Sequence, residues 1–164
     1  MQDYETWMLD AVADARLALD TGDVPVAAFV LDAAGNRIGS GRNAREKSND
    51  PTAHAEILAI REAAESLGDW HLEHTTLVVT LEPCIMCAGA ILNSRIPRVV
   101  FGAWDEKAGA VGSVYDLLRD RRLPHRVEVF AGVQADACAT LLREFFEAKR
   151  QNVGRRGVTR GSET

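Results

Sequence analysis

The segment from Thr75 to Asn93 constrains the fold of this chain more than any other. Residues Thr75 to Leu81 are rich in β-branched side chains, which favours a strand. The motif Glu82-Pro83-Cys84-Ile85-Met86-Cys87 follows at once, and helix-forming residues continue to Asn93. Because proline suits the first turn of a helix, the segment predicts a strand that passes almost directly into a helix. The two cysteines then lie on one face of its first turn.

A second predicted helix start carries polar side chains in a similar place. Asp50 is typical of an N-cap, and Pro51 is typical of a first helical residue. His54 and Glu56 then fall in the first turn, ahead of an apolar run that ends near Leu67. Residues i and i+2 do not share a face along a helix, but in a first turn both side chains can lean toward a ligand beyond the helix end.

Strand and helix patterns alternate along most of the chain. In addition to the helix that contains Cys84 and Cys87, we predict helices at Asp3–Leu19, Pro51–Leu67, Val114–Arg119 and Gln134–Arg150. The predicted strands are Val24–Leu31, Arg37–Asn43, Thr75–Leu81, Arg98–Gly102 and Arg126–Ala131. The polar stretch from Arg42 to Asn49 is predicted to be a loop. This alternation indicates an α/β fold with a mixed five-stranded sheet covered on both faces.

The length of 164 residues favours one folded domain, which we place at residues 1–150. Residues 151–164 are glycine-rich and basic without periodicity, so we expect a flexible basic tail. The sequence has neither a signal-peptide pattern nor an apolar run near the roughly 20 residues of a membrane span, so we expect a cytoplasmic protein with no membrane partner. The formal net charge of -5 argues against broad phosphate binding but allows a local basic patch.

The three cysteines argue against a secreted disulfide framework, because their number is odd and two of them form a Cys-x-x-Cys motif. Helices that follow strands of one sheet can begin along the same edge, which would bring His54, Cys84 and Cys87 together. One nitrogen and two thiolates leave the fourth tetrahedral position of a zinc ion for water, as in catalytic zinc sites. Glu56 is placed to move a proton between that water and a substrate nitrogen. A redox pair or a structural zinc site remains the alternative.

With these motifs the chain resembles the zinc-dependent cytidine and nucleotide deaminases, and within them the bacterial tRNA-specific adenosine deaminases. The similarity runs from about Trp7 to Phe146. It is densest in three segments: Asp50–Ile57, Val79–Ala90 and Ser94–Ala103. The loop Asp105–Ser113 continues the third segment and distinguishes these enzymes from their small-molecule relatives. The resemblance implies a three-layer α/β/α cytidine-deaminase-like fold.

The resemblance also implies a role for each residue of the site. It implies one Zn²⁺ per subunit, held by His54, Cys84 and Cys87. It makes Glu56 the proton shuttle, Asn43 a hydrogen-bond partner of the purine, and Asp105 a contact to a ribose hydroxyl beside the flipped base. Taken alone, Asn43 is more typical of a turn at a strand end, and Asp105 of an N-cap.

The implied reaction is hydrolytic deamination of the wobble adenosine of a tRNA anticodon to inosine. The resemblance therefore implies the tRNA anticodon stem-loop as a partner, and it also implies a homodimer. One alternative is a deaminase of a free base or nucleoside, such as guanine or cytosine, which the acidic net charge supports and the Asp105–Ser113 loop opposes. An alternative of another class is a noncatalytic zinc or Cys-x-x-Cys redox module.

Overall fold

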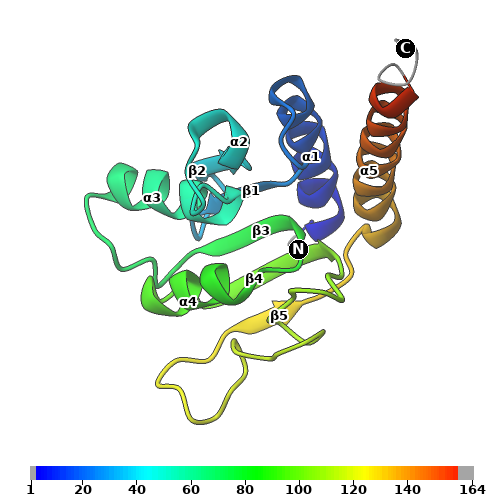
Figure 1. Cartoon of the computed structure of the whole chain (residues 1–164). Helices are drawn as coiled ribbons and strands as arrows, with labels where there is room; N and C mark the ends of the chain where they lie inside the picture. The colour runs from blue at the N-terminus through cyan, green and yellow to red at the C-terminus, as the bar shows by residue number, and fades with distance from the viewer. Residues whose placement is uncertain (1–2, 159–164) are drawn as a thin grey trace.

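A mixed sheet of five strands forms the centre of the computed structural model, which describes residues 3–158 (Figure 1). The strands are β1 (Ala27–Leu31), β2 (Arg37–Arg42), β3 (Thr76–Leu81), β4 (Arg98–Ala103) and β5 (Glu128–Phe130). Their order across the sheet is β2-β1-β3-β4-β5. β1 is antiparallel to both neighbours, whereas β3, β4 and β5 run parallel. The predicted mixed α/β sheet is confirmed.

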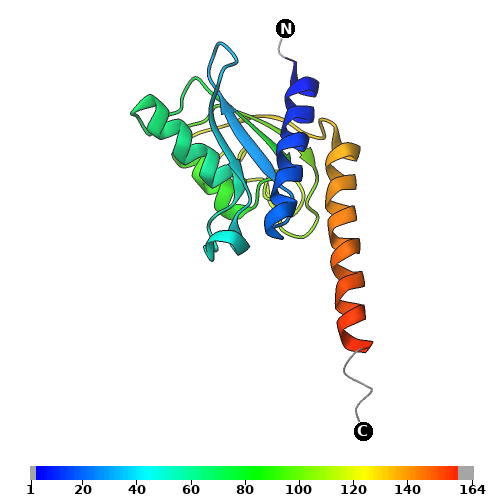
Figure 2. The same ribbon diagram turned by 90° about the horizontal axis from the view of Figure 1, so that it is seen from above.

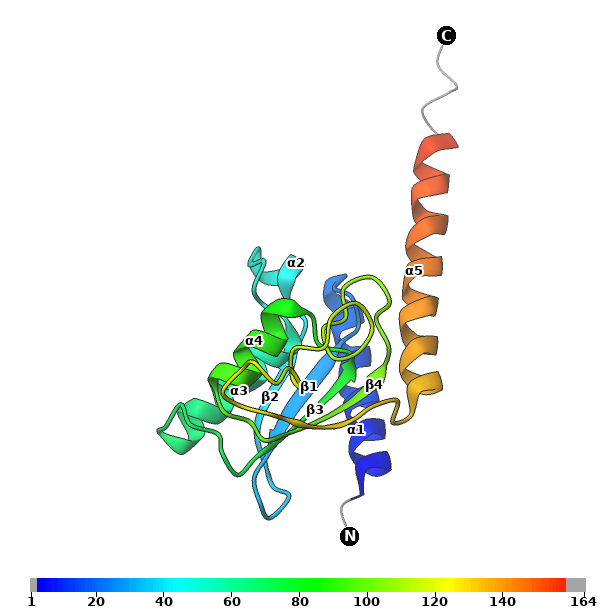
Figure 3. The same ribbon diagram turned by 90° about the horizontal axis from the view of Figure 1, so that it is seen from below.

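Helices cover both faces of this sheet, which gives the predicted three layers (Figure 2). The helices α1 (Tyr4–Arg16) and α5 (Ala135–Val158) lie on one face, and α3 (Ala55–Leu67) and α4 (Ile85–Asn93) lie on the other (Figure 3). A 3-10 turn, η1 (Leu17–Thr21), extends α1, and a short helix, α2 (Arg45–Ser48), follows β2. No helix within residues 3–158 is long and apolar enough to cross a membrane.

The central strands are buried on both faces, which explains their continuous apolar sequence. On β1, Ala28 and Val30 pack with the α3–α4 layer, whereas Phe29 packs with the α1–α5 layer. β3 follows the same alternation, with Val79 on the first face and Val78 on the second. Each layer therefore buries its own apolar cluster against one side of the sheet.

The direction of the strands determines where the two site helices begin. β2 and β3 are both antiparallel to β1, so they point the same way. α3 comes after β2 and α4 comes after β3, so both helices start at the same edge of the sheet. This confirms the predicted convergence of the two helix starts.

Several predicted boundaries were wrong for local reasons. His54, not Asp50, is the N-cap of α3. Asp50 instead accepts hydrogen bonds from the amide and hydroxyl of Thr52 in a preceding turn, so the Asp-Pro signal belongs to that turn. The predicted loop after β2 contains α2, which is held by the buried Asp23 through the backbone amides of Glu46 and Lys47.

Two predictions for the second half of the chain also differ from the structure. Residues 114–119 form no helix, because Val111 pairs with Asp116 and the Leu117 amide bonds to the Ala110 carbonyl. Residues 151–158, which the sequence places in the tail, continue α5 to Val158 along the helix seen in Figure 2. Extending an existing helix costs far less than starting one. The rest of that predicted tail lies outside the described residues.

The edge strand β2 meets α3 through glycines. A Cβ atom on Gly41 would collide with the carbonyl oxygen of Ala55, and one on Gly39 would collide with that of Ala59. The helix backbone therefore lies directly against the strand. Because Ala55 is the first residue of α3, this contact also fixes the start of the helix next to His54.

We predict that Gly41→Ala destabilises the protein by roughly 1–3 kcal/mol, the usual cost of forcing extra volume into a packed contact. Denaturant unfolding monitored by circular dichroism measures the change. Gly89→Ala is the matched control, because a Cβ on Gly89 of α4 meets no atom within 4 Å. It should leave stability unchanged or raise it by about 0.5–1 kcal/mol through helix propensity. Equal effects of the two substitutions would contradict the packing argument.

Candidate active site

Three side chains suited to metal binding meet where α3 and α4 begin. His54 is the N-cap of α3 and Cys84 is the N-cap of α4, and neither side chain caps its own helix. Cys87 lies in the first turn of α4 and is fully buried. The backbones of His54 and Cys84 are extended, so the two side chains project beyond the helix ends.

The distances between the donor atoms fit tetrahedral zinc. His54 Nδ1 lies 3.7 Å from Cys84 Sγ and 3.5 Å from Cys87 Sγ. Zinc bonds of about 2.3 Å to sulfur and about 2.1 Å to nitrogen, at tetrahedral angles, require a nitrogen–sulfur separation of roughly 3.6 Å. The donor atoms of all three side chains lie within 4.8 Å of one another, and no other such group of histidine, cysteine or acidic residues is found within residues 3–158. The predicted ligand set is therefore assembled.

The pKa values of the two cysteine thiols are shifted in opposite directions. The pKa of the Cys84 thiol is lowered to about 3, first by a hydrogen bond from Cys87 and then, against the effect of burial, by one from His54. The same pairing, together with burial, raises the pKa of Cys87. The lowered pKa favours the thiolate form of Cys84, which is the form that coordinates zinc.

Glu56 lies in the same cavity and is only 4% exposed. Burial raises the pKa of its carboxyl group to about 7, although the nearby His54 opposes the shift. A carboxyl group with a pKa near neutrality can both accept and donate a proton at physiological pH. Its position beside the metal donors suits proton transfer to or from a bound molecule.

These groups open onto a cavity of about 230 Å³. The predicted substrate residues Asn43 and Asp105 both line it, as do His54, Glu56 and Cys84. The remaining lining residues are Val24, Val26, Arg45, Ala55, Leu81, Glu82 and Ala108. Cys87 lies behind this wall, so the structure brings all six predicted site residues to one place.

Asn43 and Asp105 also stabilise their own loops. The Asn43 amide donates to the carbonyl of Val24 over 3.1 Å. Asp105 Oδ1 accepts from the amides of Lys107 and Ala108 at 3.0 and 3.1 Å. Both residues therefore have the local structural roles that the sequence alone favours, and both also line the cavity.

Glu82 is a further site residue, and no sequence pattern assigns it a role. It is 1% exposed and lines the cavity. Burial alone would raise the pKa of this carboxyl group, but hydrogen bonds from Ser113, Asp105 and Val111 outweigh it and lower the pKa. Its position between a buried strand and Pro83 was the only signal in the sequence, because its partners lie more than twenty residues away.

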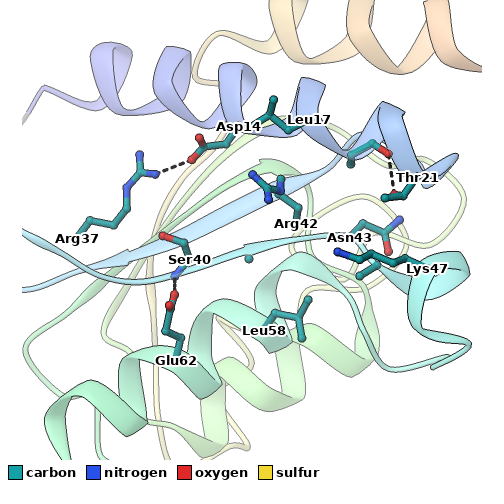
Figure 4. Close-up of a pocket in the computed structure, with 13 residues that line it drawn as sticks. Asp14, Leu17, Thr21, Arg37, Ser40, Arg42, Asn43, Lys47, Leu58 and Glu62 are labelled. Carbon is teal, nitrogen blue, oxygen red and sulfur yellow. Dashed lines mark hydrogen bonds and ion pairs between the residues drawn. The ribbon is translucent and has the colours of Figure 1, made fainter.

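A larger cavity of about 490 Å³ lies beside the first, and Asn43 lines both (Figure 4). Figure 4 shows its polar side chains, among them Arg37 paired with Asp14 at 2.5 Å and Glu62 bonded to the Ser40 amide. It contains neither a set of metal donors nor a buried proton-transfer group. The metal donors and the proton-transfer group therefore lie at the smaller cavity, and the larger cavity is not the candidate active site.

The fold and the zinc donor set define a zinc-dependent deaminase. Consistent with this, residues 1–103 match the cytidine and deoxycytidylate deaminase zinc-binding region. The chain is 49% identical to the tRNA-specific adenosine deaminase of Haemophilus influenzae over 140 residues, which cover 85% of this chain and 80% of the relative. It is 44% identical to that of Bacillus subtilis, with 92% and 93% covered. The chain belongs to the family of tRNA-specific adenosine deaminases.

Solved structures agree with this assignment. A structure from a study of A-to-I editing by tRNA:A34 deaminases at the wobble position of transfer RNA has a TM-score of 0.78 and 39% identity, with 83% of this chain and 99% of that chain covered. A guanine deaminase from Nitrosomonas europaea has a TM-score of 0.77 but 26% identity, with 88% and 85% covered. This chain superposes about equally well on both structures, so the fold alone does not distinguish the two activities. The higher sequence identity favours the tRNA deaminase.

We predict that Cys87→Ala lowers the zinc content from about one ion per chain to far below one, because two ligands do not complete a tetrahedral zinc site. Elemental analysis of dialysed protein measures the content. Cys138→Ala is the control, because Cys138 is also buried but packs between α5 and the sheet. It should retain the metal. Equal zinc in the two variants would remove Cys87 from the donor set.

Proposed function

We propose that this chain hydrolyses the wobble adenosine of a tRNA anticodon to inosine and releases ammonia. One observation carries the chemistry: a buried carboxyl group, Glu56, lies in one cavity with a His-Cys-Cys zinc donor set. The substrate follows from family membership, because identity to the tRNA-specific adenosine deaminases reaches 42–49% over most of the chain. Guanine deaminases share the fold at lower identity.

In this reaction the side chains divide the work. His54, Cys84 and Cys87 hold zinc, which when bound lowers the pKa of a coordinated water toward ~7. Glu56 accepts a proton from the attacking water and delivers it to N1 of the adenine ring while the water oxygen bonds to C6. The second proton moves from the hydroxyl group now on C6 to the amino group, the bond between C6 and that nitrogen breaks, and ammonia leaves. Adenosine and water are thereby converted to inosine and ammonia.

The residues around the donor set are proposed to select the substrate. The Asn43 amide hydrogen-bonds the purine, and this role is supported by its place at the cavity wall. Asp105 is proposed to accept a hydrogen bond from a ribose hydroxyl beside the flipped base, which DNA cannot offer. Its Oδ1 atom is engaged with the loop, so the proposed contact uses the other carboxylate oxygen.

We further propose that the enzyme is a homodimer, as the family resemblance implies. Large apolar side chains remain exposed on the α3–α4 layer, namely Leu67 at the end of α3, Trp70 in the loop that follows, and Ile85 at the start of α4, which are 49%, 56% and 53% exposed. Burial of this apolar surface in a subunit interface would be favourable. Sedimentation equilibrium should return twice the mass of 17.9 kDa across a wide concentration range. Monomer at every concentration would contradict the proposal.

The reaction is tested with an anticodon stem-loop of arginine tRNA that carries adenosine at the wobble position. We predict that the zinc-loaded protein converts this adenosine to inosine, as measured by mass spectrometry of the digested RNA. Free guanine and cytosine are offered in parallel reactions. Turnover of one of these bases without any inosine would favour a deaminase of free bases instead.

Glu56→Gln provides the catalytic control in the same assay. The amide matches the carboxyl group in size but cannot carry a proton back and forth, so turnover should fall by roughly 10²- to 10⁴-fold. Zinc content should stay unchanged, because Glu56 is not among the metal donors. A variant that kept full activity would exclude Glu56 as the proton shuttle, and a noncatalytic zinc module would show no activity in either form.

A further inference from the structure

Glu82 is a buried carboxylate at the junction of β3 and the metal-binding helix α4. Burying a charged carboxylate is costly unless hydrogen-bond donors surround it. Glu82 has four such donors, all from one loop. They are the backbone amides of Asp105, Val111 and Ser113 and the hydroxyl group of Ser113.

The two carboxylate oxygens connect both ends of this loop, residues 105–113. Oε2 accepts the Asp105 amide at 2.9 Å and the Ser113 hydroxyl group. Oε1 accepts the amides of Val111 and Ser113, each at 3.0 Å. A carboxylate offers about four acceptor positions, so the donors of the loop use the whole group.

The middle of the loop packs against the same side chain and against the start of α4. A Cβ atom on Gly109 would collide with the Glu82 carboxylate. Gly109 also forms a bridge with the zinc ligand Cys84, and the next amide, of Ala110, donates to the Pro83 carbonyl at 2.8 Å. The loop is thus joined at several points to the segment from Glu82 to Cys84, and Glu82 accepts most of the hydrogen bonds between the two.

We propose that Glu82 is a positioning residue for the deamination reaction, which holds Asp105 at a fixed place on the cavity wall relative to the zinc ligands. The proposal rests on the proposed function, since Asp105 is the residue proposed to contact the ribose. Glu82 is not among the metal donors, and both of its carboxylate oxygens accept hydrogen bonds from the loop. Its effect on catalysis passes through the backbone of Asp105.

Replacement by glutamine isolates this role, because an amide retains only one acceptor oxygen. In one orientation the amide oxygen faces the backbone amides of Val111 and Ser113, and the new NH₂ group faces the Asp105 amide, so two donors meet there. The Ser113 hydroxyl group can rotate and accept a hydrogen bond from the NH₂ group. In the opposite orientation the NH₂ group would face two backbone amides, so the first orientation is favoured. Glu82→Gln therefore displaces Asp105 in particular.

The experiment compares Glu82→Gln with the wild type on the anticodon stem-loop. We expect kcat/KM to fall by about tenfold to ~100-fold, as for other small displacements of substrate-positioning groups. Most of the fall should appear in KM, because the displaced contact holds a ribose outside the reacting base. Zinc content should stay the same. The matched control is Glu73→Gln, an exposed carboxylate paired with Arg95 at 3.0 Å, and it should change nothing.

A double-mutant cycle with Asp105→Ala separates positioning from a general effect on the fold. Removal of the Asp105 side chain leaves its amide in place but removes the group that Glu82 positions. Adding Glu82→Gln to Asp105→Ala should then cost little further activity. A fully additive loss, or a loss of zinc in Glu82→Gln, would overturn the proposal.

Ser113→Ala carries the same test if Glu82→Gln folds poorly. It removes one donor to Oε2, the oxygen that also binds the Asp105 amide. We expect a smaller rise in KM that disappears in the Asp105→Ala background. A wild-type enzyme that makes no inosine contradicts the proposed function. An active wild type with unaffected Glu82→Gln and Ser113→Ala variants contradicts the role of Glu82 alone.

Discussion

The site depends on one constraint of the sheet, namely that β2 and β3 run the same way on either side of β1. The helices that follow these strands therefore begin at one edge, and their N-cap residues His54 and Cys84 meet there. Neither side chain caps its own helix, so both are available to a ligand beyond the helix ends. The positive pole of α4 also favours a thiolate at that place. Strand direction and helix polarity thus bring the metal donors together.

Close packing against the edge strand fixes the position of α3. α3 lies with its backbone against Gly39 and Gly41, and this close approach leaves no freedom to move toward the sheet. α4 is fixed differently, through the short connection from β3 and the burial of Cys87. A shift of α3 away from the strand would carry His54 away from both cysteines. Residues on an edge strand therefore affect a site that they do not line.

The parts of this arrangement that could be predicted from sequence are those encoded by neighbouring residues. The strands, the long helices and the zinc ligands follow from apolar periodicity and from the spacing of Cys84 and Cys87. The start of α3 could not be placed well, because Asp50 forms a turn that uses the same residue types as a helix cap. Glu82 could not be identified, because its role depends on donors more than twenty residues away.

The loops of the site are ordered by the residues proposed to bind substrate. The Asn43 side chain donates a hydrogen bond to the Val24 carbonyl, and the Asp105 side chain accepts one from the Lys107 amide in the turn after Asp105. Both side chains are therefore oriented by contacts within the protein itself. Ordering a free side chain on binding costs roughly 0.5–1.5 kcal/mol, and this cost is avoided where folding has already fixed the side chain. A structural role for these residues is therefore no argument against a binding role. The hydrogen bonds that stabilise the loops also prepare the cavity wall for its ligand.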